Sequence, residues 1–236
     1  MYQAYQPPRS FSVFPPVIKN LLILNGLFFM AQFAASADPG GILGRILTAM
    51  ALYAPGAPDV GFTIFGTRDM IPGFWPWQLI SYGFLHGGFT HIFFNMFALW
   101  MFGAQLENAW GSRRFAIFYF SCVAGAALIH LAWIGLTVNF PYPVPTLGAS
   151  GGVFGVLMGF GMMFPEQRIM LLFPPIPLKA KWFVIGYGAL SLFFGVSGLQ
   201  GGVAHFAHLG GMLFGFLLIM YWRGKLPVKP EQRMYW

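Results

Sequence analysis

Charged residues are scarce in this chain. Asp, Glu, Lys and Arg make up 8% of its 236 residues, and only 6 positions are acidic. A soluble protein of this length covers much of its surface with such side chains, whereas here 57% of the residues are hydrophobic. The composition therefore excludes an ordinary soluble domain and predicts an all-α polytopic membrane protein with a single membrane domain.

Three further absences narrow the function classes. The single cysteine, Cys122, excludes an internal disulfide and a thiolate metal cluster. The chain has no His-Glu-x-x-His segment, so a membrane zinc protease has no support, and we expect neither a metal nor a cofactor. The net charge of +7 is spread along the chain instead of forming one basic patch, so no nucleic-acid partner is expected.

Six apolar runs are candidates for helices that cross a bilayer, which takes about 20 residues each. A long connection follows the first run, at residues 37–76, and it is rich in Gly, Pro and aromatic side chains. We expect this connection to lie partly in the membrane interface, where tryptophan is enriched. The expected spans are residues 17–36, 79–103, 115–136, 147–164, 182–197 and 203–222.

The basic residues predict how the spans are oriented. Six spans place both termini on one side, and of the 13 Lys and Arg residues only Arg45 and Arg68 fall on the other. Because cytoplasmic loops carry the excess of Lys and Arg, both termini are predicted to be cytoplasmic. Residues 1–16 then form a cytoplasmic segment, residues 17–222 a six-helix membrane domain, and residues 223–236 a basic, aromatic cytoplasmic tail.

A serine among glycines begins the fourth span. Residues 148–152 read Gly-Ala-Ser-Gly-Gly, and Ser150 is expected about one turn inside the helix, at its outward end. Unpaired N–H groups and the helix dipole favour developing negative charge there. The alternative interpretation is a close helix crossing, because small residues are also typical of contacts between membrane helices.

A histidine lies at comparable depth in the sixth span. His208, Gly211 and Gly215 are three and four residues apart, so they share one helical face that lets a neighbouring helix approach closely. If the fourth and sixth spans touch through their glycines, Ser150 and His208 can come within hydrogen-bond reach. A nucleophile beside a base is the minimal unit for acyl transfer; a buried structural histidine is the alternative.

The second span carries another polar pair. His91 and Asn95 are four residues apart on one face near the outer end, and both can donate hydrogen bonds, as an oxyanion hole requires. The alternative is interhelical hydrogen bonding that only holds the bundle together. His86 is expected to point away, towards the long connection or water, and His130 in the third span is expected to serve packing or placement at the membrane interface.

Four short motifs follow one another along residues 75–220. They are His91-x-x-x-Asn95, Gly103-x-x-x-Glu107-x-x-x-Gly111-Ser112, Gly148-x-Ser150-Gly151 and Ala207-His208-x-x-Gly211-x-x-x-Gly215. Each motif alone is weak evidence. Together, on a six-span chain, they resemble the rhomboid family of intramembrane serine proteases.

The resemblance implies a role for each matching residue. Ser150 resembles the nucleophile and His208 the general base, and no carboxylate lies where a third member would be needed. His91, Asn95 and the Ser150 amide resemble the oxyanion hole. The remaining positions that match the supporting structure of the active site are Gly148, Gly151, Phe154, Gly211 and Gly215.

Two positions depart from the family pattern. Gln78 follows Trp77 where many members have arginine, which puts the anchoring of the long connection in doubt. Phe154 stands where a tyrosine often stacks on the catalytic histidine, and it keeps the ring while losing only the hydroxyl. His208 is preferred to His205 as the general base, because only His208 is followed by glycine three and seven residues later, as in the family pattern.

The expected function is an intramembrane serine endopeptidase that cleaves transmembrane protein substrates in the lipid bilayer. A rhomboid-like protein that binds membrane clients without cleaving them is one alternative. A small transporter or channel is another, although it would need a carboxylate within a span. The expected location is the bacterial inner membrane, with the site open to the non-cytoplasmic side and the irregular segment 141–145 helping to line its cavity. The oligomeric state and the substrate are not predicted.

Overall fold

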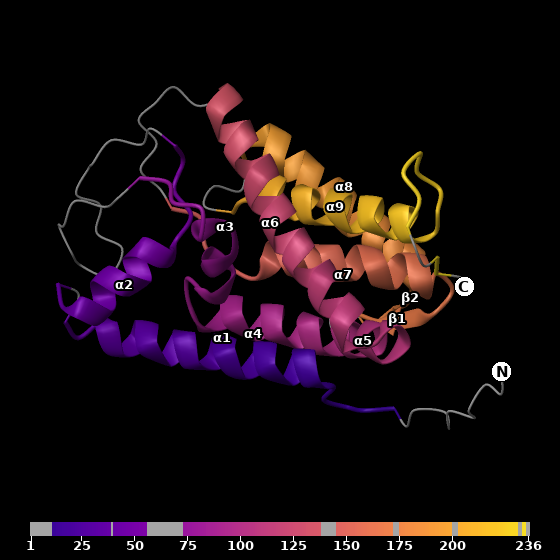
Figure 1. Ribbon diagram of the computed structural model, residues 1–236, viewed down its shortest axis with the longest axis horizontal. Coiled ribbons are helices and arrows are strands. Elements are labelled where there is room, and N and C mark those ends of the chain that lie inside the picture. Colours follow the sequence, from indigo (N-terminus) through magenta and orange to yellow (C-terminus); the bar gives the residue numbers. More distant parts are fainter. Residues whose placement is uncertain are drawn as a thin grey trace.

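The computed structural model consists almost entirely of helices (Figure 1). The only strands among the described residues form a short antiparallel hairpin between β1 (Arg168–Met170) and β2 (Pro177–Lys179). The described residues are 11–38, 40–55, 73–137, 145–171, 175–199, 203–230 and 233–234. Several segments discussed above therefore lie outside the described residues. They are most of residues 1–16, residues 56–72 of the long connection, residues 141–144 of the irregular segment, and parts of the tail.

Four helices in the described ranges are long and apolar enough to cross a membrane. Each begins and ends within three residues of an expected span, so the chain is an integral membrane protein. The four helices are α1 (Pro16–Ala35), α6 (Ser112–Thr137), α8 (Ala180–Ser197) and α9 (His205–Trp222).

The second expected span, residues 79–103, is wrong as one continuous helix. The chain leaves the helical conformation at Leu85, where ψ is 146°, and Gly88 is extended. The Gly87-Gly88 pair disfavours an uninterrupted helix at this point. Before the break lie α3 (Gln78–Ser81) and the 3₁₀ turn η1 (Tyr82–Phe84); after it, α4 (Phe89–Ala98), the π-helical turn η2 (Leu99–Gly103) and α5 (Ala104–Trp110) follow without interruption.

The fourth expected span also begins later than predicted. Helix α7 runs from Ser150 to Met163, so Ser150 is its first residue and does not lie a full turn inside. Thr146 instead forms an isolated antiparallel bridge with Leu52, and Gly148 has a φ of +125°, which no right-handed helix contains. Because the first four N–H groups of a helix have no intrahelical partner, the Ser150 amide is left available.

Helix α7 packs against both α6 and α9, which also pack against each other, and α8 lies alongside α9 (Figure 1). Every glycine of α7 is buried, and the large fully buried side chains come mainly from the helices around it. The core is therefore built around a helix with a small cross-section. Its large members include Leu99, Leu106, Phe115, Phe118, Tyr119, Phe160 and Ile219.

The buried carboxylate of Glu107 holds α1 against α5 and α6. Its two oxygens accept the N–H groups of Val17 and Ile18 at 2.9 and 2.8 Å, and the Ser112 hydroxyl donates to it at 2.6 Å. A negative charge beside the N-terminus of a helix is favourable. The motif that contains Glu107 and Ser112 thus caps the N-terminus of α1.

The long connection is anchored by neutral groups. Helix α2 (Ile42–Met50) lies at the end of the molecule opposite to the hairpin (Figure 1). Gln78 is fully buried; its carbonyl oxygen accepts the N–H of Tyr53 at 3.2 Å, and its amide nitrogen donates to Ala49 O at 3.3 Å. Trp77 Nε1 donates to the same Ala49 oxygen at 3.1 Å. The amide of Gln78 therefore anchors this segment without the positive charge of an arginine.

Candidate active site

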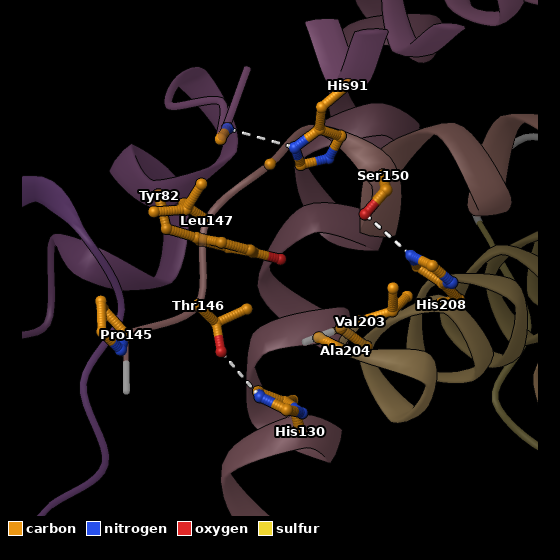
Figure 2. Close-up of a pocket in the computed structure, with 13 residues that line it drawn as sticks. Tyr82, His91, His130, Pro145, Thr146, Leu147, Ser150, Val203, Ala204 and His208 are labelled. Atoms are coloured by element: carbon orange, nitrogen blue, oxygen red, sulfur yellow. Dashed lines mark hydrogen bonds between the residues drawn. The ribbon is translucent and has the colours of Figure 1, made fainter. Parts of the chain in front are cut away.

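Ser150 and His208 come together as the sequence predicts. Ser150 Oγ and His208 Nε2 are 2.9 Å apart, although 58 residues separate them in the chain (Figure 2). Both side chains line a cavity of about 380 Å³ at the end of the bundle where α7 and α9 begin. With the imidazole proton on Nδ1, Nε2 accepts the Ser150 O–H, which is the arrangement that activates a serine nucleophile.

The glycine faces of α7 and α9 make this approach possible. A Cβ added at Gly211 would overlap the Gly151 carbonyl oxygen, and one at Gly215 would lie 3.1 Å from Gly155 O. A side chain at either position in α9 would hold the two helices apart. The packing interpretation and the catalytic one are therefore compatible: the same close contact brings the histidine to the serine.

The His208 ring is oriented by an aromatic neighbour. Phe154 lies one turn beyond Ser150 on α7, and its ring stacks on the imidazole with centroids 4.1 Å apart and planes only 5° from parallel. His208 Nδ1 is buried and has no hydrogen-bond partner among the described residues. The described part of the site thus contains a pair and no carboxylate. His205 is also buried, and its ring meets that of His208 edge-on at 5.8 Å.

Gly148 makes room for His91. A Cβ at Gly148 would lie 2.7 Å from Cε1 and 2.8 Å from Nε2 of the His91 ring, and the φ of +125° is itself unfavourable for any other residue. The N–H of Gly148 donates to the Tyr82 carbonyl oxygen at 3.0 Å. The segment that leads into Ser150 is therefore fixed on one side by η1 and contacts the histidine on the other.

The structure brings His91 to the cavity but not Asn95. His91 lines the cavity wall beside Gly148, with Nδ1 accepting the Gly87 N–H at 3.2 Å. Asn95 is buried on the same face of α4, and its amide nitrogen donates to the His91 carbonyl oxygen at 2.9 Å. In this conformation the Asn95 amide supports the α4 backbone, and its role in an oxyanion hole stays a prediction.

Two of the other histidines lie differently from what the sequence indicates. His86 does not face water: it is 2% exposed, and its ring meets that of His91 edge-on at a centroid distance of 5.1 Å. His130 lines the cavity and forms a 2.7 Å hydrogen bond with Thr146 Oγ1. Figure 2 shows this pair at the opposite end of the cavity from Ser150 and His208.

Sequence reasoning missed Tyr82 and Thr146 as cavity residues. The Tyr82 hydroxyl donates to Val123 O at 2.8 Å, and its ring reaches across the middle of the cavity (Figure 2). Neither residue belongs to a motif, and each is brought to the site by contacts with distant segments. No signal in the sequence marks them. Apolar residues close the remaining walls, namely Pro145, Leu147, Val203, Ala204 and Ala207.

Comparison with known proteins agrees with the motifs. A profile of the rhomboid domain matches residues 74–225. Rhomboid protein 1, mitochondrial, of Saccharomyces cerevisiae is 34% identical over 144 residues, which are 61% of this chain and 41% of the yeast protein. The presenilin-associated rhomboid-like protein, mitochondrial, of Homo sapiens is 30% identical over 157 residues, which are 61% of this chain and 39% of the human protein.

A bacterial relative is matched over more of its length. The rhomboid protein YdcA of Bacillus subtilis is 32% identical over 176 residues, which are 71% of this chain and 79% of that protein. The chain thus spans about two fifths of the length of the mitochondrial relatives and most of the bacterial one. Since the profile covers well over half of the residues and includes the serine, histidine and glycine motifs, the chain belongs to the rhomboid family.

Proposed function

We propose that this protein is an intramembrane serine endopeptidase in which Ser150 is the nucleophile and His208 the general base. The observation that carries the proposal is the 2.9 Å hydrogen bond between Ser150 Oγ and His208 Nε2 inside a cavity at the start of α7. Family membership supports it, and the name of the Bacillus subtilis relative describes a candidate protease.

In the first step, Ser150 Oγ attacks the carbonyl carbon of a peptide bond while its proton moves to His208 Nε2. The carbonyl oxygen becomes an oxyanion. When the C–N bond breaks, His208 gives that proton to the leaving amine, and an ester with Ser150 remains. A water molecule then attacks the ester, its proton passes through His208 to Ser150 Oγ, and the new carboxyl end leaves.

The oxyanion needs hydrogen-bond donors that are already in place. The Ser150 N–H is free of intrahelical bonds at the first residue of α7, and the dipole of that helix favours negative charge there. His91 is the second donor in this proposal, through Nε2. Asn95 would join them only if its amide turned away from the His91 carbonyl oxygen.

The proposed membrane arrangement has six spans with both termini in the cytoplasm. The continuous stretch from α4 to α5 and the 14-residue helix α7 would add two spans to the four long helices. Helix α7 is about 21 Å long, shorter than the hydrocarbon core of about 30 Å. A helix that begins below the membrane surface lets water reach Ser150 through the cavity, which opens to the non-cytoplasmic side.

The substrates in this proposal are transmembrane segments of other proteins. The backbone of a membrane helix is fully hydrogen-bonded to itself, so a peptide bond reaches Ser150 only after the helix unwinds locally. Segments with Gly or Pro near the cleaved bond should therefore be preferred. The relatives include two mitochondrial proteins and a bacterial one, so they do not favour the bacterial inner membrane, which stays a prediction.

Labelling with a fluorophosphonate probe tests the proposal directly. The purified protein should become labelled, whereas Ser150→Ala and His208→Ala should not, and His205→Ala should keep its labelling. Circular dichroism and size exclusion must show that each variant is folded. A folded wild type that takes no label would favour the alternative of a client-binding relative without activity, and label that persists in Ser150→Ala would place the nucleophile elsewhere.

A further inference from the structure

Helix α1 contains two buried amide side chains that differ in what they contact. Asn25 donates to the carbonyl oxygen of Leu21 at 2.8 Å, within its own helix. Gln32, which is 4% exposed, instead contacts the backbone of a residue 54 positions away. A long polar side chain buried in this way usually has a specific partner, and the partner here is His86.

Gln32 binds both backbone groups of His86. The amide nitrogen of Gln32 donates to His86 O at 3.0 Å, and the His86 N–H donates to Gln32 Oε1 at 2.9 Å. His86 lies in the break between η1 and α4, where the chain is not helical and its backbone groups lack helical partners. The side chain of Gln32 replaces those partners and fixes the break in one conformation.

The residue after His86 determines which nitrogen of His91 carries the proton. The Gly87 N–H donates to His91 Nδ1 at 3.2 Å (Figure 2). A neutral imidazole has one donor and one acceptor nitrogen, so a ring that accepts at Nδ1 carries its proton on Nε2. That atom faces Gly148, where an added Cβ would lie 2.8 Å away. The Gly87 bond therefore presents an N–H donor to the segment that precedes Ser150.

We propose that Gln32 is a positioning residue for the oxyanion hole, and that it acts through the His86-Gly87 backbone on the orientation and tautomer of His91. The proposal rests on the proposed serine protease function. It gives the first helix, which lies outside residues 74–225 and contributes no side chain to the cavity wall, a part in the reaction.

The test compares Gln32→Leu with Asn25→Leu in the reconstituted full-length protein, using a transmembrane substrate that the wild type cleaves. Both changes remove a buried amide from the same helix. Gln32→Leu should lower kcat about tenfold, with KM within about twofold of wild type. This loss is smaller than the ~10²–10³-fold loss of kcat that follows removal of a whole oxyanion donor, because His91 is still present. Asn25→Leu should leave kcat within about twofold, because its amide bonds only its own helix.

A double-mutant cycle separates positioning from a general loss of structure. If Gln32 acts through His91, then Gln32→Leu should not lower kcat further once His91 is alanine. An equal loss of kcat in both backgrounds would overturn the inference, as would equal effects of the two α1 variants. The proposed function fails separately, if the wild type shows no Ser150-dependent labelling or cleavage.

Gln32→Met provides a second variant if Gln32→Leu does not fold. A thioether sulfur accepts hydrogen bonds only weakly and cannot donate one to His86 O. We expect a loss of kcat close to that of the leucine variant, again with KM unchanged and again absent when His91 is alanine. A Gln32→Met enzyme with wild-type kcat would overturn the proposal.

Discussion

At the scale of single residues, the described part of the site has an aromatic ring stacked on the histidine and no carboxylate bound to it, unlike a serine protease triad. The Nδ1 atom of His208 has no hydrogen-bond partner in the described part of the chain, and the stacked Phe154 ring restricts the imidazole on one face. In the triad the carboxylate both orients the histidine and stabilises its charged form. Here the ring can orient the imidazole, and in the proposed mechanism the negative face of its π-system would favour the imidazolium that forms during attack.

This difference predicts the effect of changing Phe154. Phe154→Leu keeps the apolar volume but removes the stacking, which is worth about 0.5–1.5 kcal/mol, so the rate of fluorophosphonate labelling should fall about two- to tenfold. Phe154→Tyr keeps the ring and should label within about twofold of the wild-type rate. Equal labelling rates for the leucine variant and wild type would show that stacking does not position His208.

The positions of the individual site residues show what sequence motifs can and cannot predict. Ser150, His208 and His91 lie at the cavity as expected from their helical neighbours, because small residues at fixed spacing determine which helices can touch. Asn95 shares a face with His91, but spacing alone could not reveal that its amide donates to the carbonyl of its own helix. Tyr82 reaches the site through a contact with Val123, 41 residues away, and no local pattern encodes such a contact.

At the scale of helices, the contact between α7 and α9 is where packing and chemistry depend on each other. We expect Gly211→Ala to force the two helices apart, because its Cβ would overlap the Gly151 carbonyl oxygen. Overpacking of this kind costs about 1–3 kcal/mol, and labelling should be lost as Ser150 and His208 separate. Thermal unfolding in detergent measures the first effect and fluorophosphonate labelling the second.

Gly186→Ala is the matched control. Gly186 lies in α8, and nothing comes within 4 Å of a Cβ placed there. Alanine is the better helix former by up to about 1 kcal/mol, so this variant should be as stable as wild type or slightly more stable, with unchanged labelling. If both variants behaved alike, the close contact between α7 and α9 would not be needed for activity.

The helix predictions succeeded where hydrophobicity alone decides the structure. Spans with an unbroken apolar run, such as α6 and α8, are found within three residues of their expected limits. The predictions failed where tertiary hydrogen bonds replace helical ones. Gln32 binds the backbone of His86 in the second span, and Leu52 pairs with Thr146 before the fourth. Each of these partners lies far away in the sequence.

At the scale of the whole molecule, the helix ends that carry most of the described basic residues lie at one end. α1 begins and α9 ends near the hairpin, whereas α2, which carries Arg45, lies at the opposite end (Figure 1). Glu166 is an exposed carboxylate at the hairpin end, and hydrogen bonds from Lys179 and then Lys181 lower its pKa to about 2. Its charge is therefore present above that pH and is balanced locally, which leaves the surrounding excess of positive charge to set the proposed orientation.

Cysteine labelling in intact cells tests that orientation. Cys122 is buried and is the chain's single cysteine, so the wild type should not react with a membrane-impermeant maleimide. Ile42→Cys, at the α2 end, should become labelled from outside, and Val228→Cys should react only after the membrane is opened; the two side chains are 80% and 70% exposed. The reverse pattern would place the termini outside.

The π-helical turn η2 limits where this stretch of the chain can lose a residue. It lies between His91, at the cavity, and Glu107, which accepts the first N–H groups of α1. A π-turn holds about one residue more than an α-turn, so deleting one residue within Leu99–Gly103 would restore a regular α-helix and leave Glu107 on nearly the same face relative to His91. Deleting a residue from the regular helix α4 after His91 would instead rotate Glu107 by about 100° relative to His91, and one end of the helix would lose its partner. We therefore expect a single-residue deletion in η2 to be tolerated far better than one between Ile92 and Ala98.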